Sequence, residues 1–302
     1  MLAGAALTLL AACGGGTSQI EPFEPAQMIV FGDEASLIRD DGLRYTVNPR
    51  NATTGTVDCT SQPIWVQAVA RRLGFVFAGC DAADATGTKA QMRAAAGARV
   101  DDVKLQIDQQ AEGPGFAAKS LATVLAGGND ILALYAQYPQ RSEDDLIADA
   151  RQRGERLALQ VNRLVDLGPR VLLVTVPDLG LSPYALAQKT AYTDTDRAAL
   201  ISRLVSAFNS RVRTTILNDG RYIGLVLGDE AVQAMVRLPV VYGLKDATTA
   251  VCTVALPQCT DQTLVEGGSS ASWLWAGDRQ LAYGGQVQLG NLAVTRVIGN
   301  PF

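Results

Sequence analysis

The sequence of 302 residues contains no histidine. Histidine is the only side chain whose unperturbed pKa lets it take up and return a proton near neutral pH. Its absence excludes an imidazole base, the usual partner of a serine or cysteine nucleophile. It also removes a common metal ligand, and no two cysteines stand two to four residues apart, so we expect neither a metal nor another cofactor.

Positive charge is also sparse. The chain has 26 Lys and Arg against 30 Asp and Glu, a formal net charge of −4. No basic cluster interrupts the sequence, so we expect no nucleic acid partner. No repeat of fixed period is present. With 48% hydrophobic and 19% charged residues, the chain has the composition of a globular protein with one large α/β domain or two small ones.

The first thirteen residues form a short apolar run that ends on small residues. The run is too short to span a bilayer as a helix and is typical of a cleaved secretory signal. The ending Leu10-Ala-Ala-Cys13 resembles the lipobox of bacterial lipoproteins. The resemblance implies cleavage before Cys13, lipidation of its sulfur and a membrane anchor. Gly14 in place of aspartate favours the outer membrane of a Gram-negative bacterium. A plain secretory signal and a buried apolar helix are the alternatives.

Short strand patterns and longer helical patterns alternate along the rest of the chain. This alternation implies parallel crossovers and a sheet covered on both faces, so we predict a three-layer α/β/α sandwich with a mainly parallel sheet. We expect a flexible tether over 14–27 and a single domain over 28–302. The predicted strands are 27–31, 121–126, 170–176 and 222–227, and the predicted helices are 64–75, 100–110, 142–167, 194–217 and 285–297.

Four cysteines remain once Cys13 is set aside, an even number in a chain that we expect to be exported. An oxidising location favours disulfides. Pairing Cys59 with Cys80 and Cys252 with Cys259 closes the shortest loops, and free buried thiols are the alternative.

Three segments carry unusual residues, two of them directly after predicted strands. They are Phe31-Gly-Asp-Glu-Ala-Ser36, Gly127-Gly-Asn-Asp130 and Trp273-Leu-Trp-Ala-Gly-Asp-Arg-Gln280. Sites in open α/β sheets gather just past the carboxyl ends of strands. We therefore expect the three segments to form one site.

Taken in order, these segments resemble the GDSL, or SGNH, hydrolase family of lipases and esterases. The resemblance spans roughly 27–297, including 176–183 and 242–247, and implies the family's flavodoxin-like sandwich. It also implies a serine in the first segment as nucleophile, a glycine and an asparagine as oxyanion donors, and a final aspartate and histidine. The Gly-x-Asn-Asp motif is intact, so Asn129 matches the oxyanion asparagine, and Gly97 is the candidate glycine. The turns around them would be supported by Gly32, Asp33, Gly127 and Asp130.

The departures from the family pattern fall on its catalytic groups. Glu34 stands where the serine is expected, Gly277 where the aspartate is, and Gln280 where the histidine is. The resemblance therefore implies the fold of an esterase in which no member of the catalytic triad is intact.

Hydrolysis by other groups is less well supported. Ser36 is two residues too late for the turn. Glu34 could act with Asp33 or Asp278, as paired carboxylates do in glycosidases, but the resemblance gives Asp33 a structural role. A carboxylate that attacks an ester also forms a reactive anhydride. These observations favour a non-catalytic role over a rearranged hydrolase.

Glu34 itself suggests a different role. An oxyanion site is a set of donors arranged around negative oxygen. We hypothesise that the Glu34 carboxylate accepts hydrogen bonds from Gly97 and Asn129 and so fills the emptied site. The alternative is an exposed Glu34 on a relaxed loop.

The remaining candidates are aromatic and basic. Trp65, Trp273 and Trp275 are the only tryptophans, and we expect core packing from them rather than ligand stacking. Arg279 is either a solvated surface residue or a contact for an anionic ligand.

The expectation that follows is a binding protein rather than an enzyme. Its ligand would be an acylated glycan or lipid that carries an ester. The alternatives are an esterase with rearranged catalytic residues and an interaction protein of the cell envelope.

Overall fold

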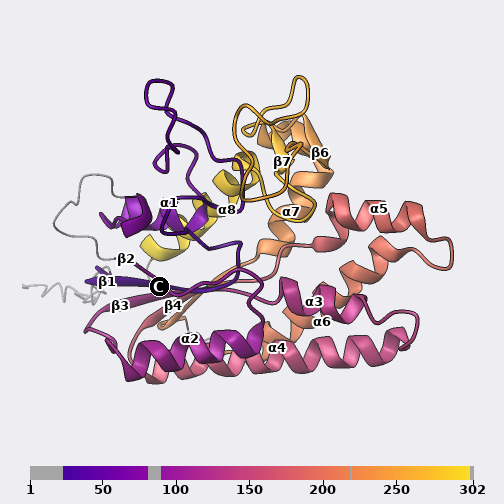
Figure 1. Ribbon diagram of the computed structural model, residues 1–302. Helices are drawn as coiled ribbons and strands as arrows, with labels where there is room; N and C mark the ends of the chain where they lie inside the picture. Colours follow the sequence, from indigo (N-terminus) through magenta and orange to yellow (C-terminus); the bar gives the residue numbers. More distant parts are fainter. Residues whose placement is uncertain (1–22, 81–89, 218–219, 300–302) are drawn as a thin grey trace, which may run out of the picture.

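A five-stranded parallel sheet forms the centre of the computed structural model, which describes residues 23–80, 90–217 and 220–299. Its strand order is β2-β1-β3-β4-β5, the doubly wound order of flavodoxin-like folds. The sheet confirms the predicted parallel architecture (Figure 1). The strands are β1 Gln27–Gly32, β2 Ala90–Met92, β3 Ser120–Leu125, β4 Arg170–Val174 and β5 Ile223–Val226.

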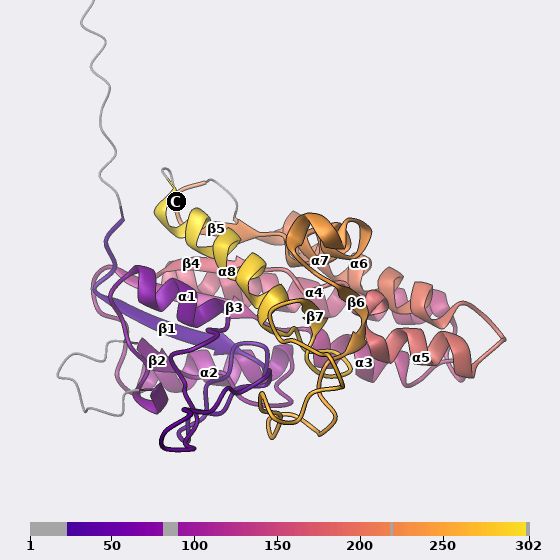
Figure 2. The ribbon, with the colours of Figure 1, turned by 90° about the horizontal axis from the view of Figure 1, so that it is seen from above.

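Helices cover both faces of the sheet, which confirms the three layers (Figures 1 and 2). Each face has its own apolar core. The helices whose side chains fill the first core are α2 Val100–Glu112, α3 Gly128–Tyr135, α4 Glu143–Asp166, α5 Pro183–Ala191 and α6 Arg197–Thr215. The second core receives α1 Trp65–Arg72, α7 Gly228–Arg237 and α8 Tyr283–Ile298.

Capping side chains mark the starts of α4 and α6. The Ser142 hydroxyl accepts a hydrogen bond from the Asp145 amide and begins α4, as the sequence predicts. The predicted helix over 194–217 begins later, because the Asp196 carboxylate accepts from the Ala199 amide and acts as its N-cap.

Several short elements were missed by the sequence patterns. These are β2, α3, α5, α7 and a separate two-stranded parallel pair, β6 Asp246–Ala250 and β7 Trp273–Trp275. The strands among them have three to five residues and are too short to show a clear period. The pair β6–β7 lies beside the carboxyl end of the main sheet and carries the third motif (Figure 1).

The long segment between β1 and α1 has no regular structure and is organised around one buried cation. Arg44 is fully buried, and its guanidinium donates to the backbone carbonyls of Cys59, Ser61 and Gln62 at 3.1–3.3 Å. Burial lowers the pKa of Arg44 to about 10, so it stays charged at neutral pH.

Both expected disulfides are present. Cys59 is bonded to Cys80 and Cys252 to Cys259. The predicted signal and lipobox over 1–13 lie outside the described residues, as does 14–22 of the tether. Among the helices that the structure describes, none is both long and apolar enough to cross a bilayer.

Candidate functional site

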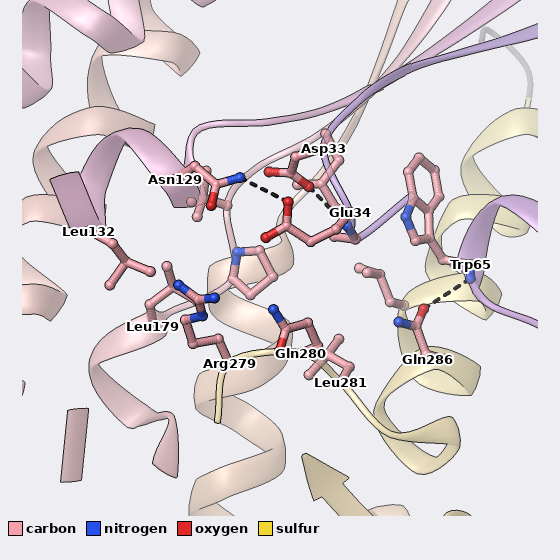
Figure 3. A pocket seen from close by; sticks show the side chains of 16 residues that line it. Asp33, Glu34, Trp65, Asn129, Leu132, Leu179, Arg279, Gln280, Leu281 and Gln286 are labelled. Carbon is pink, nitrogen blue, oxygen red and sulfur yellow. Dashed lines mark hydrogen bonds between the residues drawn. The ribbon is translucent and has the colours of Figure 1, made fainter. Parts of the chain in front are cut away.

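The three sequence motifs meet in one small pocket at the carboxyl end of the sheet (Figure 3). The pocket has a volume of about 60 Å³, far below the several hundred Å³ of sites for drug-sized ligands. Its lining is mainly apolar, from Leu125, Leu132, Val176, Pro177, Leu179, Leu281 and Leu289. Its polar lining comes from Asp33, Glu34, Asn129, Arg279, Gln280 and Gln286.

The turn after β1 requires glycine at Gly32. Its φ is +133°, and a Cβ there would lie 2.0 Å from the Leu125 carbonyl oxygen. The amide side chain of Gln106 fixes this turn from α2, since it accepts from the Gly32 amide at 2.8 Å and donates to the Gly32 carbonyl at 2.9 Å. Gln106 was not among the predicted site residues, although its position between Val103 and Ile107 on one helix face was a signal of burial.

The Glu34 carboxylate makes the contact that the sequence predicts. Its Oε2 accepts a hydrogen bond from the Gly97 backbone amide at 2.9 Å and from Asn129 Nδ2 at 2.9 Å. Asn129 also donates to the Ala98 carbonyl at 3.1 Å. The residues that the family resemblance assigns as oxyanion donors thus converge on one carboxylate oxygen, and Figure 3 shows the bond from Asn129.

The first and last residues of the second motif, Gly127 and Asp130, fix its conformation. Gly127 has a φ of +120°, and a Cβ there would lie 2.4 Å from the Phe208 ring, so the turn into α3 needs glycine. Asp130 is buried and accepts from the Val100 amide at 2.9 Å and from Arg153 at 3.1 Å. Asp130 therefore joins the starts of α2 and α3 to α4, and positions Asn129.

Asp33 is buried in the turn that follows β1. Its Oδ1 accepts from the Ala35 amide at 3.0 Å, which gives it the bracing role expected from the sequence. Burial and the charge of Glu34 raise the pKa of Asp33 well above its usual range. Asp33 is therefore costly to ionise in the folded protein.

The third motif faces Glu34 across the pocket. The Ala276 amide donates to the Gln280 carbonyl at 2.8 Å, and this turn directs Arg279 and Gln280 into the pocket (Figure 3). Gly277 and Asp278 do not line it. The Asp278 side chain is 57% exposed, 3.4 Å from Arg279, and is not a partner for Glu34.

In the part of the chain that the structure describes, no hydroxyl or thiol side chain is placed for attack in this pocket. Ser36, the serine nearest to Glu34 in the sequence, has no exposed surface and is absent from the lining. Among the residues described, no serine, threonine or cysteine lines the pocket, and no group of three or more histidine, cysteine, aspartate or glutamate side chains could hold a metal ion.

Two of the three tryptophans pack as expected, whereas Trp273 is only partly buried and donates to the Thr249 hydroxyl at 3.3 Å. Trp65 and Trp275 are fully buried in the second core, and Trp275 donates to the Ala247 carbonyl at 2.9 Å. Trp65 also forms one wall of the pocket. Gln286 of α8, which the sequence analysis did not single out, accepts from the Trp65 amide at 3.0 Å and joins this wall to α8.

Comparison with known proteins gives one match at the level of sequence families. The model of the GDSL-like lipase/acylhydrolase family matches residues 28–269. A comparison with curated proteins found no match.

Solved structures with a similar course of the chain include an acetylxylan esterase, Axe2, from Geobacillus stearothermophilus. It is 15% identical, with 92% of this chain and 96% of that chain covered and a TM-score of 0.43. A mutant of the same bacterium's acetyl-xylooligosaccharide esterase is 12% identical over 92% and 96% of the two chains, with a TM-score of 0.44.

Proposed function

This chain belongs to the family of GDSL-like lipases and acylhydrolases, and we propose that it is a non-catalytic member that binds an acylated ligand. The observation that carries this proposal is the hydrogen bonding of Glu34 to Gly97 and Asn129. An oxyanion site accelerates acyl transfer because its donors are free to stabilise charge that develops in the transition state. Here the donors already bind a carboxylate.

The chemistry of the surrounding residues supports the same proposal. Acyl transfer needs a nucleophile and a base, and the chain contains no histidine. Gln280, at the position where the resemblance places histidine, is an amide that does not take up a proton at neutral pH. Glu34 occupies the serine position and is engaged as an acceptor.

The lining of the pocket favours a short acyl group as the part of the ligand that enters. About 60 Å³ of mainly apolar space accepts a few carbon atoms rather than a long chain. Arg279 and Gln280 in the lining can donate to a carbonyl oxygen. The glycan or lipid that carries the acyl ester would then remain outside the pocket.

An assay of ester hydrolysis tests the non-catalytic part of the proposal. We expect no turnover of short-chain aryl esters by the native protein. Turnover that disappears in Glu34→Ala would overturn the proposal and favour an esterase with rearranged residues. The triple variant Glu34→Ser, Gly277→Asp, Gln280→His restores the family pattern, and activity in that variant alone would support a preserved pocket.

Thermal denaturation with added ligands tests the binding part. A ligand that binds only the folded state raises the melting temperature with concentration. We expect acetylated or butyrylated sugars to do so, and their deacylated counterparts not to. The Leu179→Trp variant, which fills the pocket, is the control. No shift with any acylated compound would instead favour an interaction protein of the cell envelope.

We also propose that lipid on Cys13 anchors the protein to the outer membrane of a Gram-negative bacterium. The Leu10-Ala-Ala-Cys13 ending supports this, and the two disulfides fit an oxidising compartment. Detergent phase partitioning of expressing cells tests it. We expect the native protein in the detergent phase and processing to be blocked in Cys13→Ala. A native protein found only in the aqueous phase would contradict the anchor.

A further inference from the structure

The turn that joins α7 to β6 carries the two most exposed large apolar side chains that the structure describes (Figure 1). Val240 is 85% exposed and Val241 is 75% exposed, and Leu238, directly before the turn, is 54% exposed. Valine and leucine are usually buried in folded proteins. Adjacent apolar side chains that project into solvent indicate a surface for interaction.

The backbone of this turn holds the valines outward. The Val241 amide donates to the Leu238 carbonyl at 3.0 Å, and the Leu244 amide donates to the Pro239 carbonyl at 2.9 Å. The Leu244 side chain is buried in the second core and fixes the end of the turn. Burial of the valines would break these hydrogen bonds, so their exposure is a property of the folded backbone.

Basic residues flank the turn, and no acidic residue lies within it. Arg237 and Lys245 stand at its two ends and are exposed, and no described residue forms an ion pair with either. The nearest carboxylate in the sequence, Asp246, accepts from the Thr248 and Thr249 amides at 2.7 Å. An apolar tip between positive charges is typical of a segment that lies in the surface of an anionic bilayer.

The apolar surface continues from the turn onto α8. Tyr242, the last residue of the turn, lines the same groove as Leu292 of α8, and Leu292 is 46% exposed. Tyrosine is enriched at membrane–water interfaces, because its ring is apolar and its hydroxyl is polar. The turn and this part of α8 can therefore meet a lipid surface together.

We propose that the segment 238–242 inserts into the surface of an anionic phospholipid bilayer. Val240 and Val241 then lie among the acyl chains, and Arg237 and Lys245 lie at the phosphate groups. A bilayer needs no groove of matching shape on its own side, which suits two adjacent side chains that project from a fixed turn.

The choice of lipid as the occupant rests on the proposed lipid on Cys13. Cys13 lies ten residues before Phe23, the first described residue, and ten residues span at most about 35 Å. A domain held so near a bilayer meets lipid at a far higher effective concentration than it meets any soluble partner.

Fluorescence quenching by lipids with brominated acyl chains tests the proposal on the full-length protein in vesicles of phosphatidylethanolamine and phosphatidylglycerol. The emission that Val241→Trp adds to that of the native protein should fall by at least about half in brominated vesicles, because the side chain enters the acyl region. Leu159→Trp is the matched control. Leu159 is 52% exposed on α4, which covers the other face of the sheet from α7, so its added emission should not change.

Flotation of the same vesicles separates this proposal from the lipid anchor. Leu238→Trp should also be quenched, and adding Val240→Asp and Val241→Asp should remove this quenching. The triple variant should still float if Cys13 carries lipid. Loss of its flotation would contradict the anchor and support the turn as the site of membrane contact.

Two outcomes would overturn the proposal. In the first, Val241→Trp floats with the vesicles and is quenched no more than Leu159→Trp, which would leave a protein as the occupant of the turn. In the second, the native protein does not float at all, which would contradict both the turn and the anchor.

Discussion

Asp33 makes the site sensitive to pH in a direction that can be tested. Burial, followed by the charge of Glu34, raises its pKa in the folded state well above its usual range. Between the unfolded pKa, about 3.9, and the raised folded value, the folded state binds more protons. The free energy of unfolding contributed by Asp33 therefore falls as pH rises through that window.

Asp33→Asn should stabilise the protein at pH 7, because it removes the buried charge and keeps the oxygen that accepts from Ala35. The melting temperature of the variant should exceed that of the native protein at pH 7, and the difference should shrink on acidification. Asp108→Asn is a control that should lower the melting temperature at pH 7, since Lys104 and Arg163 hold the pKa of Asp108 below its usual value. A native protein as stable as Asp33→Asn at pH 7 would contradict this account.

Arg44 is the residue on which the β1–α1 segment depends. Arg44→Met would leave the carbonyls of Ser61 and Gln62 without their donor, while the Cys59 carbonyl would keep the Gln67 amide at 2.8 Å. Unsatisfied buried acceptors cost roughly 1–3 kcal/mol each, so we expect a loss of at least about 2 kcal/mol in urea denaturation. Arg50→Met is the control, because Arg50 is exposed and donates only to Gly55, and surface changes usually stay within about 0.5 kcal/mol.

At the scale of elements, α4 and α6 pack closely because Gly154 has no side chain. A Cβ there would lie 2.4 Å from the Phe208 carbonyl oxygen. Glycine to alanine normally stabilises a helix by about 1 kcal/mol. Gly154→Ala should do the reverse and cost about 1–3 kcal/mol, because it forces the helices apart. Chemical denaturation measures this, with Arg151→Ala on the exposed side of α4 as control. A stabilised Gly154→Ala would show that the helices can shift freely.

The longer elements could be predicted from the sequence because their apolar period is unambiguous. The helix over 142–167 and the strand over 170–176 match α4 and β4 to within a residue or two. The short elements could not, since β7 is three residues long and α3 begins inside a glycine-rich motif. These elements are stabilised by contacts distant in sequence, which no local pattern contains.

The residues of the site also divide into those that were predicted from the sequence and those that were missed. The resemblance to the family was sufficient to predict the contact of Glu34 with Gly97 and Asn129, because it implies that these two residues are oxyanion donors beside the position of Glu34. The supporting residues Gln106 and Gln286 were missed. Each is a buried polar side chain on a helix whose partner lies 74 or 221 residues away, so its role depends on the packing of the whole molecule.

At the scale of the whole molecule, the two disulfides should contribute unequally to stability. The Cys59–Cys80 bond spans a sequence separation of 21, and the Cys252–Cys259 bond one of 7. In the chain-entropy model a threefold longer loop restricts the unfolded chain more, by about 1 kcal/mol. The first bond also closes the segment that Arg44 organises, since Cys59 supplies one of its carbonyl acceptors.

We therefore expect the double variant Cys59→Ala, Cys80→Ala to lose more stability than Cys252→Ala, Cys259→Ala. Urea denaturation of both variants under oxidising conditions measures the difference. Reductant should lower the stability of the native protein at least as much as the more damaging of the two double variants does, because both disulfides are then open. If the Cys252–Cys259 variant were the less stable, loop length would not be the deciding term. The local packing of Cys259, which is fully buried, would then outweigh the entropy of the unfolded chain.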